Sequence, residues 1–241
     1  MGRRTVPLVP DHLDALAATL PSGCGTCLVW ELDPVRRGRL GAGDDVRTEE
    51  KHAWLAEVLR EWGSCGRTLL VDDAPVGYVV YAPASAVPGA ACLPTAPVSP
   101  DAVLMTTAYV HPAHRGGAGR LLVQGMARDL VRRAAEGGPR AVEAFGAVGG
   151  AGAGCRVPAE FLARTGFRTQ RPHPTTPRLR MDLRSTVPWR DEVEAAIERL
   201  VGVVRPAAAP APALPSALPT RTTMPRNDED RDGRRRPGPH R

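Results

Sequence analysis

The chain has 241 residues, of which 42% are hydrophobic and only 4% aromatic, and its formal net charge is +6. Because domains commonly span about 100–200 residues, this length excludes two full domains and favours one domain with an extension. Eight arginines and four acidic residues fall after residue 204, so most of the positive charge belongs to the extension. The composition therefore gives little support to a nucleic-acid partner for the folded part.

Neither the start of the chain nor any later segment has about 18 consecutive apolar residues. We therefore expect no membrane span and no export signal, and a cytoplasmic location. The five cysteines, an odd number, are then better interpreted as thiols or metal ligands than as a disulfide framework. Nothing in the sequence excludes an oligomer.

The first third of the chain predicts one strand and two helices. Residues 4–9 favour a short edge strand, because proline is tolerated at such an edge, and residues 11–20 place their leucines on one helical face. Residues 21–47 are rich in turns. A second helix is predicted from Thr48, interpreted as its N-cap, to Gly63.

Three strands are predicted next. Residues 67–73 and 75–83 are rich in Val, Leu and Tyr, and the Asp-Asp-Ala-Pro stretch between them predicts a hairpin turn. A proline-rich segment follows, and a third strand is predicted at 102–110. Loops vary most freely between related proteins, so residues 21–47 and 84–100 are the expected substrate-binding segments.

The remaining elements alternate between helix and strand. They are a helix at 120–134, a strand at 140–145, a short helix at 158–165 stopped by Gly166, a strand at 177–185 and a closing helix at 189–201. This order indicates a single α/β (α+β) domain at 1–204, in which helices flank one mixed central sheet. Residues 205–241, rich in Pro, Ala and Arg without apolar periodicity, predict a disordered tail.

The passage from the third strand into the helix at 120–134 points to an anion. The sequence "AYVHPAHRGGAGRLL" starts at Ala108 and reaches the helix through three glycines. The first N–H groups of a helix lack partners within it and carry partial positive charge, so phosphate binds well there. Glycines admit a close approach, and Arg115 and Arg120 add charge. A nucleotide P-loop requires Gly-Lys-Ser/Thr, which Gly119-Arg120-Leu121 does not provide, and a tight turn that binds nothing remains the alternative.

A strand ending in Val, followed by x-Pro-x-x-Arg-Gly-Gly-x-Gly-Arg and a Leu-Leu helix, resembles the acyl-CoA motif of the GNAT superfamily of N-acetyltransferases. The predicted order of elements is also similar to that family's over about residues 4–185. The chain departs from the motif at one position, since His114 stands where the family has Arg or Gln. The resemblance implies a GNAT-like fold, acetyl-CoA as acyl donor, and an amine-bearing small molecule or protein as acceptor. The implied pyrophosphate contacts are the amides of Arg115, Gly116, Gly117, Ala118, Gly119 and Arg120, and the implied pantetheine contacts are Ala108, Tyr109 and Val110.

The catalytic residues that the family often uses are missing. Leu162 occupies the position of a tyrosine acid, and Met105–Thr107 hold no glutamate. Glu143 in the fourth strand, flanked by apolar Val142 and Ala144, is the candidate base, acting through water; the alternative is a solvated strand residue. A chain with the cradle but without turnover would be a CoA-binding regulatory or scaffold module, and this alternative function stays open.

The cysteines allow three interpretations. Cys24 and Cys27 have the two-residue spacing of half a zinc site, which Cys65 and Cys155 would complete if the N-terminal segment folds over the sheet. Buried free thiols are the simpler alternative. A redox Cys-x-x-Cys pair is the third, but it normally begins a helix, and the residues after Cys27 favour an extended chain. We therefore expect no bound metal.

Overall fold

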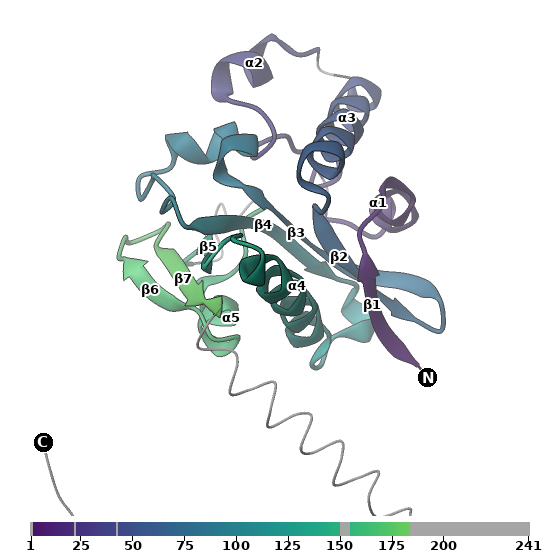
Figure 1. The fold of residues 1–241 in the computed structure, drawn as a ribbon. Coiled ribbons are helices and arrows are strands. Elements are labelled where there is room, and N and C mark those ends of the chain that lie inside the picture. Colours follow the sequence, from purple (N-terminus) through teal and green to yellow (C-terminus); the bar gives the residue numbers. More distant parts are fainter. Residues whose placement is uncertain (1, 22, 42, 150–154, 184–241) are drawn as a thin grey trace, which may run out of the picture. The chain divides into compact units, whose positions relative to one another are not determined.

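The computed structural model describes residues 2–21, 23–41, 43–149 and 155–183. The helix expected at 189–201 and the tail expected from 205 lie outside these residues, so the domain limits stay predictions. One seven-stranded sheet has the strand order β1-β2-β3-β4-β5-β7-β6, in which β4 and β5 are parallel and all other neighbours are antiparallel (Figure 1). The expected α/β fold with a mixed central sheet is confirmed.

The strands and helices follow the predicted order closely. The strands are β1 Arg3–Pro7, β2 Gly66–Val71, β3 Ala74–Pro83, β4 Ala102–Val110, β5 Ala141–Phe145, β6 Arg168–Arg171 and β7 Arg178–Asp182. The α-helices are α1 Pro10–Ala17, α2 Pro34–Arg39, α3 Asp44–Trp62, α4 Ala118–Ala135 and α5 Ala159–Arg164. Among the residues that the structure describes, no helix combines the length and apolar character needed to cross a membrane.

Two aspartates form the turn of the predicted hairpin between β2 and β3. Val71 pairs with Ala74, so only Asp72 and Asp73 form the turn, and both have positive φ, 48° and 67°. Aspartate tolerates the left-handed region because its short side chain bonds locally, and two such residues in succession match the twist of the flanking strands. The hairpin prediction is confirmed, and its turn is tighter than the four-residue stretch from which it was inferred.

Three local predictions were wrong or incomplete. Thr48 is not an N-cap: α3 begins at Asp44 after an extended Gly43, and the Thr48 hydroxyl donates to the carbonyl of Asp44 inside the helix. The turn-rich segment also contains α2, whose N-cap Asp33 accepts from two backbone N–H groups. The edge strand β6 was not predicted, because its four residues are all exposed and its sequence therefore shows no alternation of apolar and polar residues.

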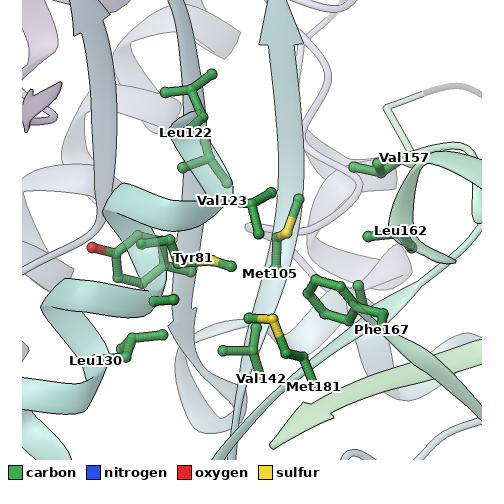
Figure 2. Close-up of a cluster of buried hydrophobic side chains, with 14 of the residues drawn as sticks. Tyr81, Met105, Leu122, Val123, Leu130, Val142, Val157, Leu162, Phe167 and Met181 are labelled. Atoms are coloured by element: carbon green, nitrogen blue, oxygen red, sulfur yellow. The ribbon is translucent and has the colours of Figure 1, made fainter. Parts of the chain in front are cut away.

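Helices cover both faces of the sheet, and the strands alternate between two apolar clusters. In β3, Val79 and Tyr81 pack toward α4, whereas Tyr78 and Val80 pack toward α1 and α3. Figure 1 shows α4 along one face and α1 and α3 on the other. Figure 2 shows the α4 side, where Val123 of the helix lies beside Met105 of β4, in the cluster that also contains Leu122. The long central strands are therefore buried on both faces and position the segment that follows β4.

Candidate functional site

The parallel strands β4 and β5 part halfway along β4. Strand β4 stays paired with β3 up to Val110, but its pairing with β5 ends at Met105, opposite Ala144. A bulge marks the parting, since Met105 and Thr107 oppose consecutive residues of β3 and Thr106 has no partner there. Within the described sheet, the β5-facing edge of residues 106–110 therefore has no strand partner, over about 16 Å at roughly 3.3 Å per residue.

A cleft of about 850 Å³ lies along the end of this edge. The cleft has the end of β4 and the glycine turn on one side and α5 with its preceding residues on the other. Its lining residues are Ala108, Tyr109, Val110, Arg115, Gly116, Gly117, Gly119, Arg120, Val157, Pro158, Phe161, Arg164 and Thr165. The structure thus brings together all the residues expected to contact acetyl-CoA except Ala118, whose side chain is buried in the core.

The glycine turn lines the cleft with a backbone that is free of side chains. Gly116 and Gly117 have φ of 87° and 88°, a backbone region that residues other than glycine rarely adopt. A Cβ atom at either position would find no heavy atom within 4 Å, so open space surrounds both residues. Helix α4 begins directly after Gly117, its N-cap, and the first helical hydrogen bond runs from Leu121 N to Gly117 O at 3.1 Å. The N–H groups of Ala118 and Gly119 precede this bond and have no partner within the helix, which suits an anion.

The opposite wall is held against the start of α4 by a close aromatic contact. A Cβ atom on Gly119 would lie 2.7 Å from Cε2 of Phe161, so only glycine lets α5 approach this closely. Phe161 and Leu162 are neighbours on α5, but Leu162 points into the core beside Phe167 (Figure 2). The position where the family often has a tyrosine acid is thus a buried packing residue in this chain.

Glu143 occupies a buried ion-pair network. Its side chain is 0% exposed, its Oε2 lies 3.2 Å from Nη1 of Arg178 and its Oε1 lies 3.4 Å from Nη1 of Arg180. The backbone N–H of Ser99 donates to the same carboxylate at 3.1 Å. The alternative of a solvated strand residue is therefore wrong. The role of Glu143 as a base acting through water stays a prediction.

The cleft beside β4 contains no carboxylate and no imidazole among its described lining residues. A second cleft of about 400 Å³, lined by α1, the segment after it and the first half of α3, does contain them. There, Nε2 of His52 lies 3.1 Å from Oδ1 of Asp14. Spacing could not reveal this pair, because its two residues come from different helices.

Two tyrosines whose rings are in tilted contact connect the clefts. Tyr109 lines the first cleft, Tyr78 lines the second, and their ring centroids are 6.0 Å apart. The Tyr109 hydroxyl donates to the carbonyl of Thr19, in the segment that bounds the second cleft. Tyr109 therefore fixes the end of β4 to the N-terminal segment.

The loop around Gly89 fixes the residues beside the second cleft. Gly89 N donates to Trp30 O at 3.2 Å, and a Cβ atom on Gly89 would overlap the carbonyl oxygen of Val29. We expect Gly89→Ala to lower the free energy of unfolding by about 1–3 kcal/mol, as overpacking usually does. Urea denaturation measures the effect, and Gly38→Ala, at an exposed helical glycine with open space around it, is the matched control. Equal stability of the two variants would contradict the close contact.

Each expected cysteine ligand also has a defined place. Cys24, Cys27 and Cys155 are half-buried, whereas Cys65 is buried in the core. In the part of the chain that the structure describes, no group of three or more Cys, His, Asp or Glu residues is arranged to hold a metal ion. The four-cysteine zinc site is therefore not formed by these residues.

Comparison with known proteins gives a likeness in structure alone. No family model matches the chain, and no curated protein matches it in sequence. One similar solved structure is the PaiA N-acetyltransferase of Thermoplasma acidophilum in complex with coenzyme A, at 8% identity, a TM-score of 0.47, and 76% and 99% coverage of this chain and that one. An N-acetyltransferase of Staphylococcus aureus has 12% identity, a TM-score of 0.46 and the same coverage of both chains.

The Escherichia coli ribosomal-protein-S18-alanine N-acetyltransferase is also similar, at 12% identity and a TM-score of 0.43, with 76% of this chain and 94% of that one covered. At such TM-scores these likenesses carry no argument about activity. The chain's own strand order, its parting of β4 from β5 and its glycine turn at α4 define a GNAT-like fold. The arrangement of the sheet thus agrees with the resemblance that the motif showed.

Proposed function

We propose that this protein is an acetyl-CoA-dependent N-acetyltransferase that moves an acetyl group to an amine of a small molecule or protein. The observation that carries the proposal is that the unpaired edge of β4 leads, through one short 3-10 turn at Pro112–His114, to the glycine turn at the start of α4. An extended chain of amides ending in a diphosphate matches both features at once. The edge offers main-chain hydrogen bonds to the amides, and the turn offers N–H groups to the diphosphate.

The proposed donor site fits the charges and the space of the cleft. The amides of residues 116–119 hold the diphosphate, and Arg115, Arg120 and Arg164 line the same cleft, where their positive charge complements that of the diphosphate. Residues 106–110 pair with the pantetheine arm, which places the thioester near the bulge at Thr106. Thioester chemistry supplies an activated acyl carbon, and holding it at a fixed position beside the acceptor lowers the entropic part of the barrier.

The acceptor side of the proposal rests on the second cleft. Asp14 and Asp44 line it with carboxylates that attract a protonated amine, and His52, oriented by Asp14, is placed to remove a proton from that amine. Once His52 has taken one proton from the protonated amine, the neutral nitrogen bonds to the acyl carbon while the carbon–sulfur bond breaks, and the second proton that the nitrogen loses neutralises the departing thiolate. In this proposal His52 joins Glu143 as a candidate base. Turnover measurements on a variant of each residue decide which of the two acts as the base.

The CoA-binding module without turnover remains the second candidate. The absence of carboxylate and imidazole groups among the described residues of the first cleft favours it, as does Leu162 in place of a tyrosine. Under this candidate the protein binds the nucleotide and regulates or positions another component.

Calorimetric titration with acetyl-CoA and with desulfo-CoA, followed by assay of CoA thiol release against a panel of amines, tests both candidates. We expect micromolar affinity for both ligands, because the diphosphate and the pantetheine arm make the contacts. Thiol release with an amine identifies the enzyme, and binding without release for any amine supports the module. Absence of binding to either ligand would overturn both candidates.

A further inference from the structure

Three cysteines from distant parts of the chain meet beside the second cleft. Cys24 and Cys27 lie in the segment after α1, and Cys155 lies in the segment that leads to α5. The Cys155 thiol interacts with the thiols of both. All three are free and half-buried. This is a contact between thiols that lie more than a hundred residues apart in the sequence.

The place of Cys155 is fixed by contacts other than its thiol. The indole Nε1 of Trp30 donates to the carbonyl of Cys155 at 3.5 Å. Cys155 also packs against the apolar cluster that contains Trp30 and Tyr78. Because Trp30 follows Cys27 by three residues, these contacts hold the two cysteine-bearing segments together independently of the sulfur atoms.

Cys27 is the reactive member of the group. The hydrogen bond from Cys155 lowers the pKa of Cys27 to about 6, against the opposing effect of burial, and the Lys51 ammonium lowers this pKa further, partly offset by Glu31. The thiolate of cysteine is the nucleophile, so Cys27 is activated near neutral pH. The hydrogen bond to Cys27 raises the pKa of Cys155, which therefore stays protonated. The remaining cysteines differ, since Cys65 is buried, with a raised pKa, and Cys92 is exposed.

We propose that Cys27 and Cys155 form a reversible redox site that takes hydrogen peroxide as its oxidant. The Cys27 thiolate attacks one peroxide oxygen, the oxygen–oxygen bond breaks, and Cys27 becomes a sulfenic acid with loss of hydroxide. The Cys155 sulfur then attacks the Cys27 sulfur, a disulfide forms and water leaves. Two thiols are oxidised, one peroxide is reduced to two waters, and a dithiol reductant reverses the change.

The site lies next to a wall of the cleft beside β4. Val157 and Pro158, which line that cleft, follow Cys155 by two and three residues. A disulfide brings two sulfur atoms closer than a hydrogen bond does, so its formation draws the segment of Cys155 toward the N-terminal segment. We therefore expect oxidation to change the width of the cleft and to weaken acetyl-CoA binding.

Peptide mapping of the full chain tests the chemistry. Reduced protein is treated with hydrogen peroxide, its remaining thiols are alkylated, and the cross-linked peptides are identified by mass spectrometry. We expect a link between Cys27 and Cys155 that dithiothreitol removes, unchanged in Cys92→Ala, the control at the exposed cysteine. In Cys155→Ala we expect a sulfenic acid trapped on Cys27. Preferential oxidation of Cys92, a link between Cys24 and Cys27, or bound zinc in the purified protein would overturn the proposal.

The pH dependence of alkylation is a second measurement on the same residues. In the reduced protein we expect the alkylation rate of Cys27 to reach half its maximum at a pH of about 6. Cys155→Ala removes the hydrogen-bond donor, so the midpoint for Cys27 should rise. An unchanged midpoint in this variant would contradict the activation of Cys27 by Cys155.

Calorimetry on the two redox forms tests the connection to the cleft, which rests on the proposed function. We expect the oxidised protein to bind acetyl-CoA more weakly by roughly fivefold or more, the lower end of usual coupling between sites. The difference should vanish in Cys155→Ala. Equal affinities with a mapped disulfide would overturn the coupling alone, whereas loss of binding in both forms would overturn acetyl-CoA as ligand and leave the disulfide standing.

Discussion

Gly117→Glu is expected to abolish acetyl-CoA binding. The substitution places a carboxylate in the open space beside the first amides of α4, where the proposed diphosphate lies. Like charges there repel, and the positive φ of 88° at this position also strains any residue with a Cβ atom. We expect calorimetric heats of binding to fall to the level of buffer dilution, which corresponds to a loss of roughly a hundredfold or more in affinity.

The matched control for this substitution lies at the other end of the same helix. Gly137 has φ of 86°, is exposed, and has open space around its Cβ position, so Gly137→Glu introduces the same charge and the same backbone strain. The two sites are about 27 Å apart along an 18-residue helix. Both variants should lose similar stability, and only Gly117→Glu should lose binding. Parallel loss of affinity in both would show that the glycine turn is not the site.

Glu143→Gln is expected to lower the free energy of unfolding by about 3–5 kcal/mol, the usual effect of leaving a buried charge without its partner. Arg178 is only 5% exposed, and its Nε and Nη1 atoms have no hydrogen-bond partner, so its charge depends on the nearby carboxylate. Arg180 keeps its ion pairs with Asp101 and Asp182, so its charge stays compensated in the variant. Urea denaturation measures the change.

The control is Glu61→Gln, which removes an ion pair of similar length between exposed side chains, 3.3 Å from Arg60. Its effect should stay within about 0.5 kcal/mol, since exposed pairs contribute little. The same pair of variants tests the base role of Glu143. Unchanged stability together with lost turnover and an altered pH profile would contradict the structural role and support a base.

Local sequence signals predicted those parts of the fold whose causes are local. Helix α4 was located because its apolar residues recur at helical spacing after glycines, and the hairpin was located because Asp72 and Asp73 suit a turn. The residues expected to bind the cofactor come from the same short stretch, which contains one strand end and the start of the next helix. The N-cap of α3 was misplaced by five residues, at Thr48 instead of Gly43, because Thr48 and Asp44 are both acceptable near a helix N-terminus.

The rest of the site depends on contacts between distant residues. The parting of β4 from β5 follows from which strands pair and for how long, and neither strand's sequence shows where its partner ends. The pairing of Glu143 with Arg178 depends on the register between β5 and β7. His52 with Asp14, and Cys27 with Cys155, similarly come from segments that only the folded chain brings together.

The unpaired stretch of β4 is an exposed edge placed in the interior of a sheet. Edge strands ordinarily invite pairing with another protein chain, and proteins protect them with charges, prolines or covering segments. Here Arg115, Phe161 and Arg164 line the same cleft, and we expect their side chains to hinder the approach of a whole strand with side chains on both faces. Under the proposed function, a slender chain of amides fits where a polypeptide does not. The parting of the two strands would then favour ligands by their width and protect the same hydrogen-bonding groups from pairing with a second copy of the chain.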